Sequence, residues 1–224
     1  MEYLIHIAIL ISIYSILALS LNLVVGYTGL LSVAHAAFYG IGAYTTAILL
    51  TTTGLSFLSS VVIGILLTAL ASLCIGFVLS RFRDDYYALG SLGFGVIIYS
   101  VLLNWQSLTH GPAGIPSIPS PSFFGYQIMS SGAFLVLSVL CALLVSILCA
   151  YIAHSPFGRV LKAIREDENA LSVFGYRTVH FKLLIFVVSA IIASVAGALF
   201  ASYVTFVDPS TFSIDESIFI LVII

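Results

Sequence analysis

The sequence predicts an all-α polytopic membrane protein: a bundle of about six to seven transmembrane helices, with a broken or hairpin helix near residues 26–42. Two observations support this fold class. Of the 224 residues, 61% are hydrophobic and only 7% are charged, whereas soluble domains carry about 25% charged residues. The apolar residues also gather into runs of about 20, the length that a helix needs to cross a bilayer. A soluble globular fold is therefore excluded.

The apolar runs place the spans in order along the chain. We expect them at residues 4–25, 30–53, 55–80, 88–105, 133–153 and 181–207, with a seventh beginning near 217. Together they make residues 1–224 a single transmembrane domain. The first run lacks a basic leader and a small-residue cleavage site, so we expect a retained helix rather than a signal peptide.

The positive charges orient the bundle. Arg81 and Arg83 follow the third span, and the other lysines and arginines lie between the fifth and sixth. Two crossings separate these segments, so they lie on one side of the membrane, and their positive charge predicts that this side is the cytoplasm. A cytoplasmic loop over 154–182 and an external loop rich in proline and glycine over 106–132 follow from this orientation. The net charge of −2 excludes a basic surface for nucleic acid.

Polar residues around the second span are candidates for a substrate pathway. Only Gly26-Tyr27-Thr28-Gly29 separates the first two apolar runs. The two runs form either a tight surface hairpin or a broken, re-entrant helix, and the second arrangement would indicate a transport pathway. The pathway candidates are Asn22, Gly26, Gly29, Ser32, His35 and Thr45. Backbone geometry and hydrogen bonds between packed helices explain the same residues without any substrate.

The cytoplasmic loop has the pattern of a short amphipathic helix. Ser155-Pro156 is a helix start, because serine caps free amides and proline is tolerated in the first turn. Phe157, Leu161 and Ile164 then share one face, and Gly175 is placed to end the segment. The pattern fits an interfacial helix, a solvated connector or a helix that docks on another subunit.

Small residues and cysteines indicate packing rather than chemistry. In the sixth span Ser189, Ala193, Gly197 and Ala201 recur every four residues, and a second ridge runs one position along. Such ridges let helix backbones approach closely, so we expect internal packing there, with docking of a partner subunit as the alternative. The three cysteines lie in apolar runs, which is typical of buried thiols rather than of a disulfide or metal set.

Three separated stretches carry a family likeness. They are LNLVVGYTGLLSVAHAAFYGIGAY over 21–44, NWQSLTHGPAGI over 104–115 and SPFGRVLKAIREDENA over 155–170. They resemble the LivM-type permeases, which are membrane subunits of branched-chain amino acid ABC importers. The sequence departs from the family at His110, where we expect glycine, and at Ile224, where it ends inside an apolar run although the family continues. We therefore expect a C-terminally truncated permease.

The resemblance implies a transport subunit that is not itself an enzyme. It implies a second permease in a heterodimer, two cytoplasmic ATP-binding cassette subunits, an extracytoplasmic substrate-binding protein and the bacterial plasma membrane as its location. The partners would consume the ATP, because this sequence has no G-x-x-x-x-G-K-[ST] loop; no cofactor or metal is expected on the chain. The residues assigned to ATPase coupling are Phe157, Gly158, Arg159, Leu161, Ile164, Arg165, Glu166, Glu168 and Gly175. We expect the apolar face among them to mediate association with the ATPase.

Other functions remain as alternatives. A permease for urea or a short amide has the same motif order. An ion-coupled carrier is disfavoured, because such carriers usually need buried carboxylates and no Asp or Glu lies within a complete predicted span. Asp208, Asp215 and Glu216 flank an apparent external turn, where we expect them to be solvated. An intramembrane enzyme lacks a paired base and nucleophile, so no catalytic residue is assigned.

Overall fold

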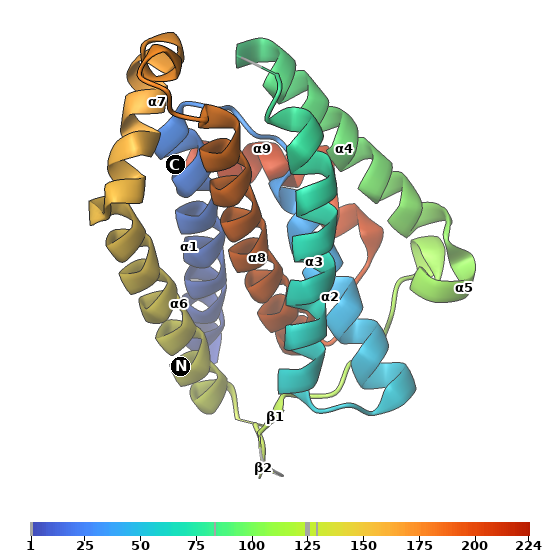
Figure 1. Cartoon of the computed structure of the whole chain (residues 1–224). Coiled ribbons are helices and arrows are strands. Elements are labelled where there is room, and N and C mark those ends of the chain that lie inside the picture. Colours follow the sequence, from blue (N-terminus) through green and yellow to red (C-terminus); the bar gives the residue numbers. More distant parts are fainter. Residues whose placement is uncertain (1, 83, 124–125, 129) are drawn as a thin grey trace.

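Five helices are long and apolar enough to cross a membrane in the part of the chain that the computed structural model describes, residues 2–82, 84–123, 126–128 and 130–224. They are α1 (Glu2–Thr28), α3 (Phe57–Leu79), α4 (Asp84–Asn104), α6 (Ser131–His154) and α8 (Thr178–Val204). Figure 1 shows α1, α3, α6 and α8 running along the bundle, while α4 slants away at one side. The prediction of an all-α polytopic membrane protein is confirmed.

The predicted second span is a shorter, central helix. α2 (His35–Ile48) continues into one turn of π-helix (Leu49–Thr53), and most of its side chains are buried. Residues 29–34 before it are not helical. Six residues therefore separate α2 from the end of α1, and α2 begins inside the bundle, which agrees with a broken helix rather than a surface hairpin.

Serine side chains from other helices accept hydrogen bonds from backbone amides at the start of α2. Its N-cap, Ala34, makes no side-chain cap. Instead the Val33 amide donates to Ser91 Oγ of α4 at 2.9 Å, and the Ala36 amide donates to Ser217 Oγ at 3.0 Å. Amides that are buried without a partner cost free energy, so these two serines allow non-helical backbone to lie within the bundle.

The small-residue ridges of α8 pack against α2. A Cβ on Gly42 would collide with the backbone carbonyl of Ser194, and one on Gly197 would collide with the carbonyl of Tyr39. The backbones of α2 and α8 are therefore in direct contact, as small residues in membrane helices permit. The internal-packing interpretation of these ridges is confirmed, and they are not a free surface for another subunit.

The loops lie at opposite ends of the bundle. On the side of the arginines, α7 (Pro156–Val173) joins α6 to α8 (Figure 1). On the other side, α5 (Gln106–Thr109), a 3-10 turn (Gly111–Ala113) and a hairpin of β1 (Ser122–Phe123) and β2 (Tyr126–Gln127) form the predicted external loop. The hairpin pairs Ser122 with Gln127, and a separate bridge joins Ile115 to Val207 after α8.

His110 has the backbone conformation that favours glycine. It stands where the family likeness leads us to expect glycine, and its φ is 60°, in the left-handed region. A residue with a Cβ adopts this conformation at a cost that glycine does not have.

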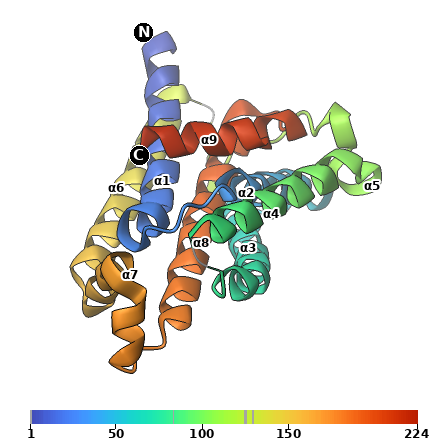
Figure 2. The ribbon, with the colours of Figure 1, turned by 90° about the horizontal axis from the view of Figure 1, so that it is seen from above.

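The chain after α8 turns back across the bundle. A 3-10 turn (Pro209–Phe212) leads into α9 (Ile214–Ile223). Figure 2 shows α9 lying across the other helices instead of beside them. The ten residues of α9 extend about 15 Å, and they are the part of the predicted seventh span that the described chain contains.

Candidate functional site

α7 has the start and end that its sequence predicts, with a kink between them. Ser155 Oγ accepts a hydrogen bond from the Gly158 amide at 3.2 Å, and Gly175 follows the helix with a φ of 85°. A Cβ on Gly158 would collide with the carbonyls at the end of α6, so glycine is needed for the tight turn there. At Asp167 the backbone leaves the helical region (φ −156°, ψ 99°).

Asp167 restarts the helix after this kink. Its Oδ1 accepts hydrogen bonds from the amides of Asn169 and Ala170 at 2.9 and 3.0 Å. Asp is a favoured N-cap residue, and here it satisfies amides that the kink leaves without helical partners. α7 is thus two short helical segments joined at one residue.

The apolar face of α7 points into the bundle. Leu161 and Ile164 are buried, and Phe157 is half-buried, stacked on Phe181 of α8 with ring centroids 5.4 Å apart. This differs from our expectation that the three side chains form the surface that meets an ATPase. They are covered by the chain's own helices and hold α7 on the bundle.

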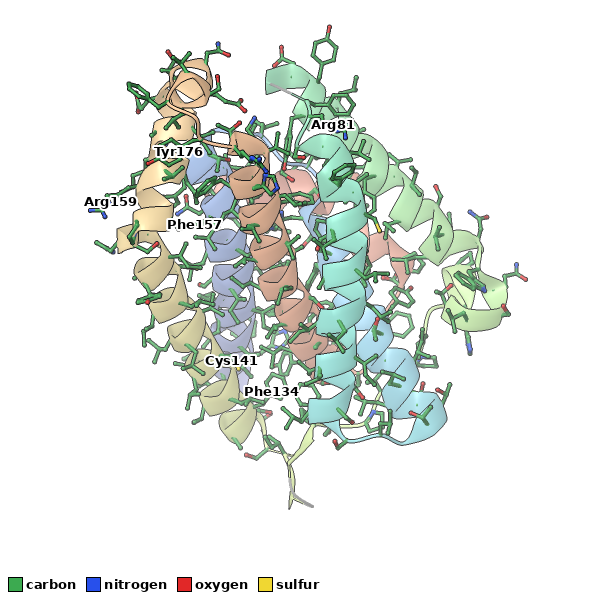
Figure 3. All side chains as sticks on the ribbon, viewed as in Figure 1. Arg81, Phe134, Cys141, Phe157, Arg159 and Tyr176 are labelled. Carbon is green, nitrogen blue, oxygen red and sulfur yellow. The ribbon has the colours of Figure 1, made fainter. Side chains whose placement is uncertain are left out.

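The large apolar side chains that α7 exposes lie at its tip instead. Val173 and Phe174 are 86% and 81% exposed, and Tyr176 is 47% exposed beside Gly175. Arg159 and Glu166 are also exposed, and Figure 3 shows Arg159 pointing away from the bundle. We define the tip as residues 173–176. The sequence analysis missed its apolar side chains, although their signal is a Val-Phe-Gly-Tyr run inside an otherwise polar loop.

Two polar contacts join α7 to the spans. Arg165 Nη1 donates to the carbonyl of Gly26, at the end of α1, at 2.6 Å. Glu168 accepts from Lys182 Nζ at 2.5 Å and from Thr178 Oγ1 at 2.8 Å, both at the start of α8. We call these five residues the junction. Lys182 is only 2% exposed, so its pairing with Glu168 offsets the cost of burying its charge.

The junction brings together residues that the sequence placed in two different roles. Gly26 and Gly29 were pathway candidates, whereas Arg165 and Glu168 were coupling candidates. Gly29 has a φ of 72°, and a Cβ there would lie 3.1 Å from Cγ of Arg165. The break between α1 and α2 therefore lies directly against α7.

His35 is a packed histidine. Its Nε2 lies 3.0 Å from Ser189 Oγ, and that hydroxyl donates to the carbonyl of Ser20 at 2.5 Å. Because the serine hydrogen goes to the carbonyl, the Nε2–H of a neutral imidazole donates to Ser189. The ring is fully buried, and it joins α1, α2 and α8 rather than lining an open path. Ser32 is buried and Thr45 half-buried, away from the hollow described next.

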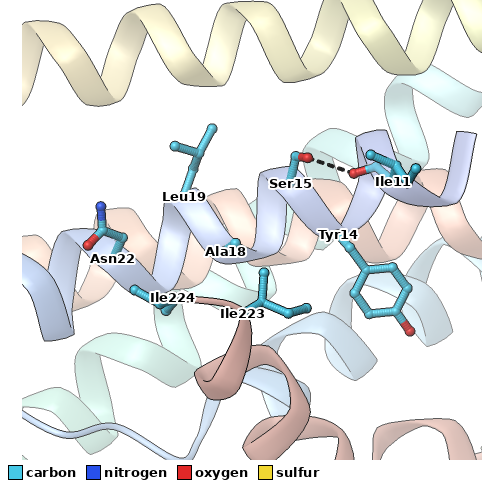
Figure 4. A pocket seen from close by; sticks show the side chains of 8 residues that line it. All are labelled: Ile11, Tyr14, Ser15, Ala18, Leu19, Asn22, Ile223 and Ile224. Atoms are coloured by element: carbon cyan, nitrogen blue, oxygen red, sulfur yellow. Dashed lines mark hydrogen bonds between the residues drawn. The ribbon is translucent and has the colours of Figure 1, made fainter. Parts of the chain in front are cut away.

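A groove of about 650 Å³ follows one face of α1 (Figure 4). We call it the α1 groove; it is lined by Ile11, Tyr14, Ser15, Ala18, Leu19, Asn22, Ile223 and Ile224. Asn22 also lines a second hollow of about 410 Å³, which includes Gly26, Arg165 and Glu166. Of the six pathway candidates, Asn22 is the one that lines the groove. It connects the groove with the junction.

The surroundings of the acidic residues differ from our expectation. Glu216 is half-buried and accepts a hydrogen bond from Tyr14 Oη at 2.7 Å. Tyr14 lies in the middle of α1, so Glu216 is not a solvated residue of an external turn. Asp215 is exposed, as expected. Burial acts to raise the pKa of Asp208, but hydrogen bonds from Thr211 and Ser210 outweigh it and hold that pKa below its usual value.

Comparison with known proteins decides the family. A family model described as branched-chain amino acid transport system / permease component matches residues 3–224. The chain belongs to this family. It is 38% identical to the high-affinity branched-chain amino acid transport system permease protein LivM of Salmonella typhimurium, and 39% identical to LivM of Escherichia coli. Both alignments cover 98% of this chain and 57% of the relative, so the chain spans little more than half the length of these relatives.

A second type of permease is also similar. LivH of Salmonella typhimurium is 26% identical over 88% of this chain and 69% of its own length. No solved structure matches. Membership in the permease family confirms the likeness that the motifs over 21–44, 104–115 and 155–170 predicted.

Proposed function

We propose that this chain is a permease subunit of an ATP-driven importer of branched-chain amino acids. It acts in a bacterial plasma membrane with a second permease, two ATP-binding cassette subunits and an external substrate-binding protein. The relatives carry the names of branched-chain amino acid permeases, and five apolar helices suit a multi-pass membrane subunit. The ion-coupled and urea alternatives have no comparable support.

The junction is the single observation that carries the coupling part of this proposal. α7 is bonded at once to the end of α1 through Arg165 and to the start of α8 through Glu168. A displacement of α7 is therefore transmitted to α1 and to α8, and α8 packs directly against α2. Interfaces of this kind switch between packed arrangements rather than deform gradually.

The break between α1 and α2 lets the end of α1 move. Residues 29–34 are not helical and begin with Gly29, whose φ of 72° costs little in glycine. A shift of Arg165 moves the Gly26 carbonyl to which it donates, while the serine caps hold the start of α2 in place. ATP-driven movement of α7 would thereby open or close the hollow that Asn22 shares between the α1 groove and the junction.

The tip is the contact through which the ATPase would move α7. Its apolar side chains are exposed at the end of a helix on the arginine-bearing side of the bundle. Exposed aromatic residues at protein surfaces are common anchors of protein interfaces. In this proposal the buried face of α7 fixes the helix to the other helices of this chain, and the exposed tip binds the ATPase.

Co-purification tests this assignment. In the assembled transporter, the double variant Phe174→Ala/Tyr176→Ala should lose the ATPase subunits and retain the second permease, because only the exposed tip changes. Phe206→Ala is the matched control, since Phe206 is a 42% exposed aromatic at the opposite end of α8. Full retention of the ATPase in the double variant would contradict the docking role of the tip.

A further inference from the structure

Glu216 is a half-buried carboxylate that has no positively charged partner among the described residues. It is half-buried opposite the middle of α1, with Oε1 held by the Tyr14 hydroxyl. Within the described residues, no lysine or arginine forms an ion pair with it. In the described chain, the lysines and arginines follow α3 or lie in α7 and around the start of α8, at positions 81, 159, 162, 165, 177 and 182. A charge at membrane depth is costly, so an ionisable residue there indicates a function and calls for a partner.

Two tyrosines from different helices complete the surroundings of Glu216. Tyr14 of α1 bonds it, and Tyr39 of α2 packs against Phe212 in the turn that leads into α9, with ring centroids 5.0 Å apart. The Tyr39 ring is fully buried between Phe200 and Phe212, yet its hydroxyl has no hydrogen-bond partner. A buried hydroxyl without a partner is rare and costly. These groups offer carboxylate and phenol oxygens as hydrogen-bond acceptors.

Tyr14, which holds Glu216, is the member of the cluster that lines the wall of the α1 groove. The rest of that wall is mainly aliphatic, from Ile11 and Leu19 of α1 and Ile223 of α9. Small-molecule sites commonly combine an apolar lining with a few convergent polar groups. The lining suits an apolar side chain, and the cluster suits a primary ammonium group.

We propose that Tyr14, Tyr39 and Glu216 form a subsite for the α-ammonium group of an amino acid passing along the α1 groove. This proposal rests on the proposed import function and deepens it. An ammonium group has three N–H donors and one positive charge. It would donate to the carboxylate of Glu216 and to phenol oxygens, and it would neutralise the otherwise unpaired carboxylate. The aliphatic wall would receive the branched side chain.

Protection of a groove thiol from alkylation tests the subsite. In the assembled transporter, with Cys74, Cys141 and Cys149 replaced, Ser15→Cys puts a reactive thiol on the groove wall. N-ethylmaleimide is the reagent, because it is uncharged and its approach does not depend on Glu216. L-Leucine should slow the labelling, whereas 4-methylpentanoate, which is leucine without its amino group, should not. Equal protection by both ligands, or by neither, would overturn the subsite.

Glu216→Gln in the same cysteine-replaced background tests whether the Glu216 carboxylate binds the ammonium group. The leucine concentration for half-protection should rise about tenfold, the size expected when a hydrogen bond to a charged group is lost. Asp215→Asn is the matched control, because it removes a neighbouring but exposed carboxylate and should change nothing. Unchanged protection in Glu216→Gln would overturn the subsite. If that variant fails to assemble, the comparison of the two ligands still decides.

Leucine uptake by the transporter before any cysteine is introduced separates the two proposals. If leucine is taken up but does not protect the groove thiol, the subsite proposal is wrong and the import function stands. If there is no ATP-dependent leucine uptake, the proposed import function is wrong, and so is the subsite proposal that rests on it.

Discussion

The contact between α2 and α8 and the junction around α7 are held together by opposite kinds of chemistry. Where α2 meets α8, glycines and small residues bring two backbones together, with Gly42 against Ser194 and Gly197 against Tyr39. At the junction, long charged side chains span between elements, as Arg165 does to Gly26. The α2 and α8 backbones are already in contact and cannot come closer, whereas long side chains at the junction can keep their hydrogen bonds when the helices shift. The molecule thus has a rigid centre and an adjustable end on the side of α7.

The largest effect is expected from adding volume at the rigid contact. Gly42→Val should destabilise the bundle by at least the upper end of the about 1–3 kcal/mol usual for overpacking, because the added atoms meet backbone, which cannot rotate away. Thermal unfolding of the purified protein measures this. Gly93→Val is the matched control, because a Cβ at Gly93 meets no atom within 4 Å. Equal losses in both variants would show that the two helices are not in tight contact.

A slightly smaller effect is expected from breaking the ion pair at the junction. Lys182→Met should destabilise the protein by about 2–3 kcal/mol, below the about 3–5 kcal/mol for a fully buried pair, because Glu168 is 19% exposed and keeps some water. Denaturation of the purified variant gives the value. Adding Glu168→Gln should restore part of the loss, because the variant then holds no carboxylate that has lost the Lys182 charge. A double variant less stable than Lys182→Met would contradict this explanation.

The smallest effect is expected at a loop outside both contacts. His110→Gly should stabilise the protein by about 1 kcal/mol, because glycine adopts a φ of 60° without the steric cost that a Cβ brings. The gain is partly offset by the greater freedom of glycine in the unfolded chain. A small rise in melting temperature would be the evidence, and a fall would show that the His110 side chain contributes more than its backbone conformation costs.

The adjustable end was easier to predict from the sequence than the rigid centre. Ser155-Pro156 and Gly175 mark the ends of α7 through local capping chemistry, which a sequence displays directly. The burial of its Phe157, Leu161 and Ile164 face was not predictable. An amphipathic pattern shows that a face is apolar, but it does not tell whether the face meets the bundle, lipid or another subunit.

The rigid centre depends on contacts between residues far apart in the chain. The apolar run from 30 to 53 suggested a full span, yet α2 starts only at His35, where serines of α4 and α9 accept hydrogen bonds from the amides of Val33 and Ala36. Glu216 was misplaced for the same reason, because its position depends on how α9 folds back toward α1. Hydropathy shows where a long apolar segment lies. It does not show where a helix breaks or folds back over the bundle, because that depends on hydrogen bonds between residues far apart in the chain.

Coupling between ATP hydrolysis and import tests the central claim most directly. In vesicles containing the assembled transporter, leucine uptake and ATP hydrolysis would be measured together for wild type, Arg165→Gln and, as a control at an exposed arginine outside the junction, Arg81→Gln. Arg165→Gln should hydrolyse ATP at close to the wild-type rate while uptake falls about tenfold, as expected for losing one charged hydrogen bond, and Arg81→Gln should resemble wild type. An unchanged ratio of leucine imported to ATP hydrolysed in Arg165→Gln would contradict the account.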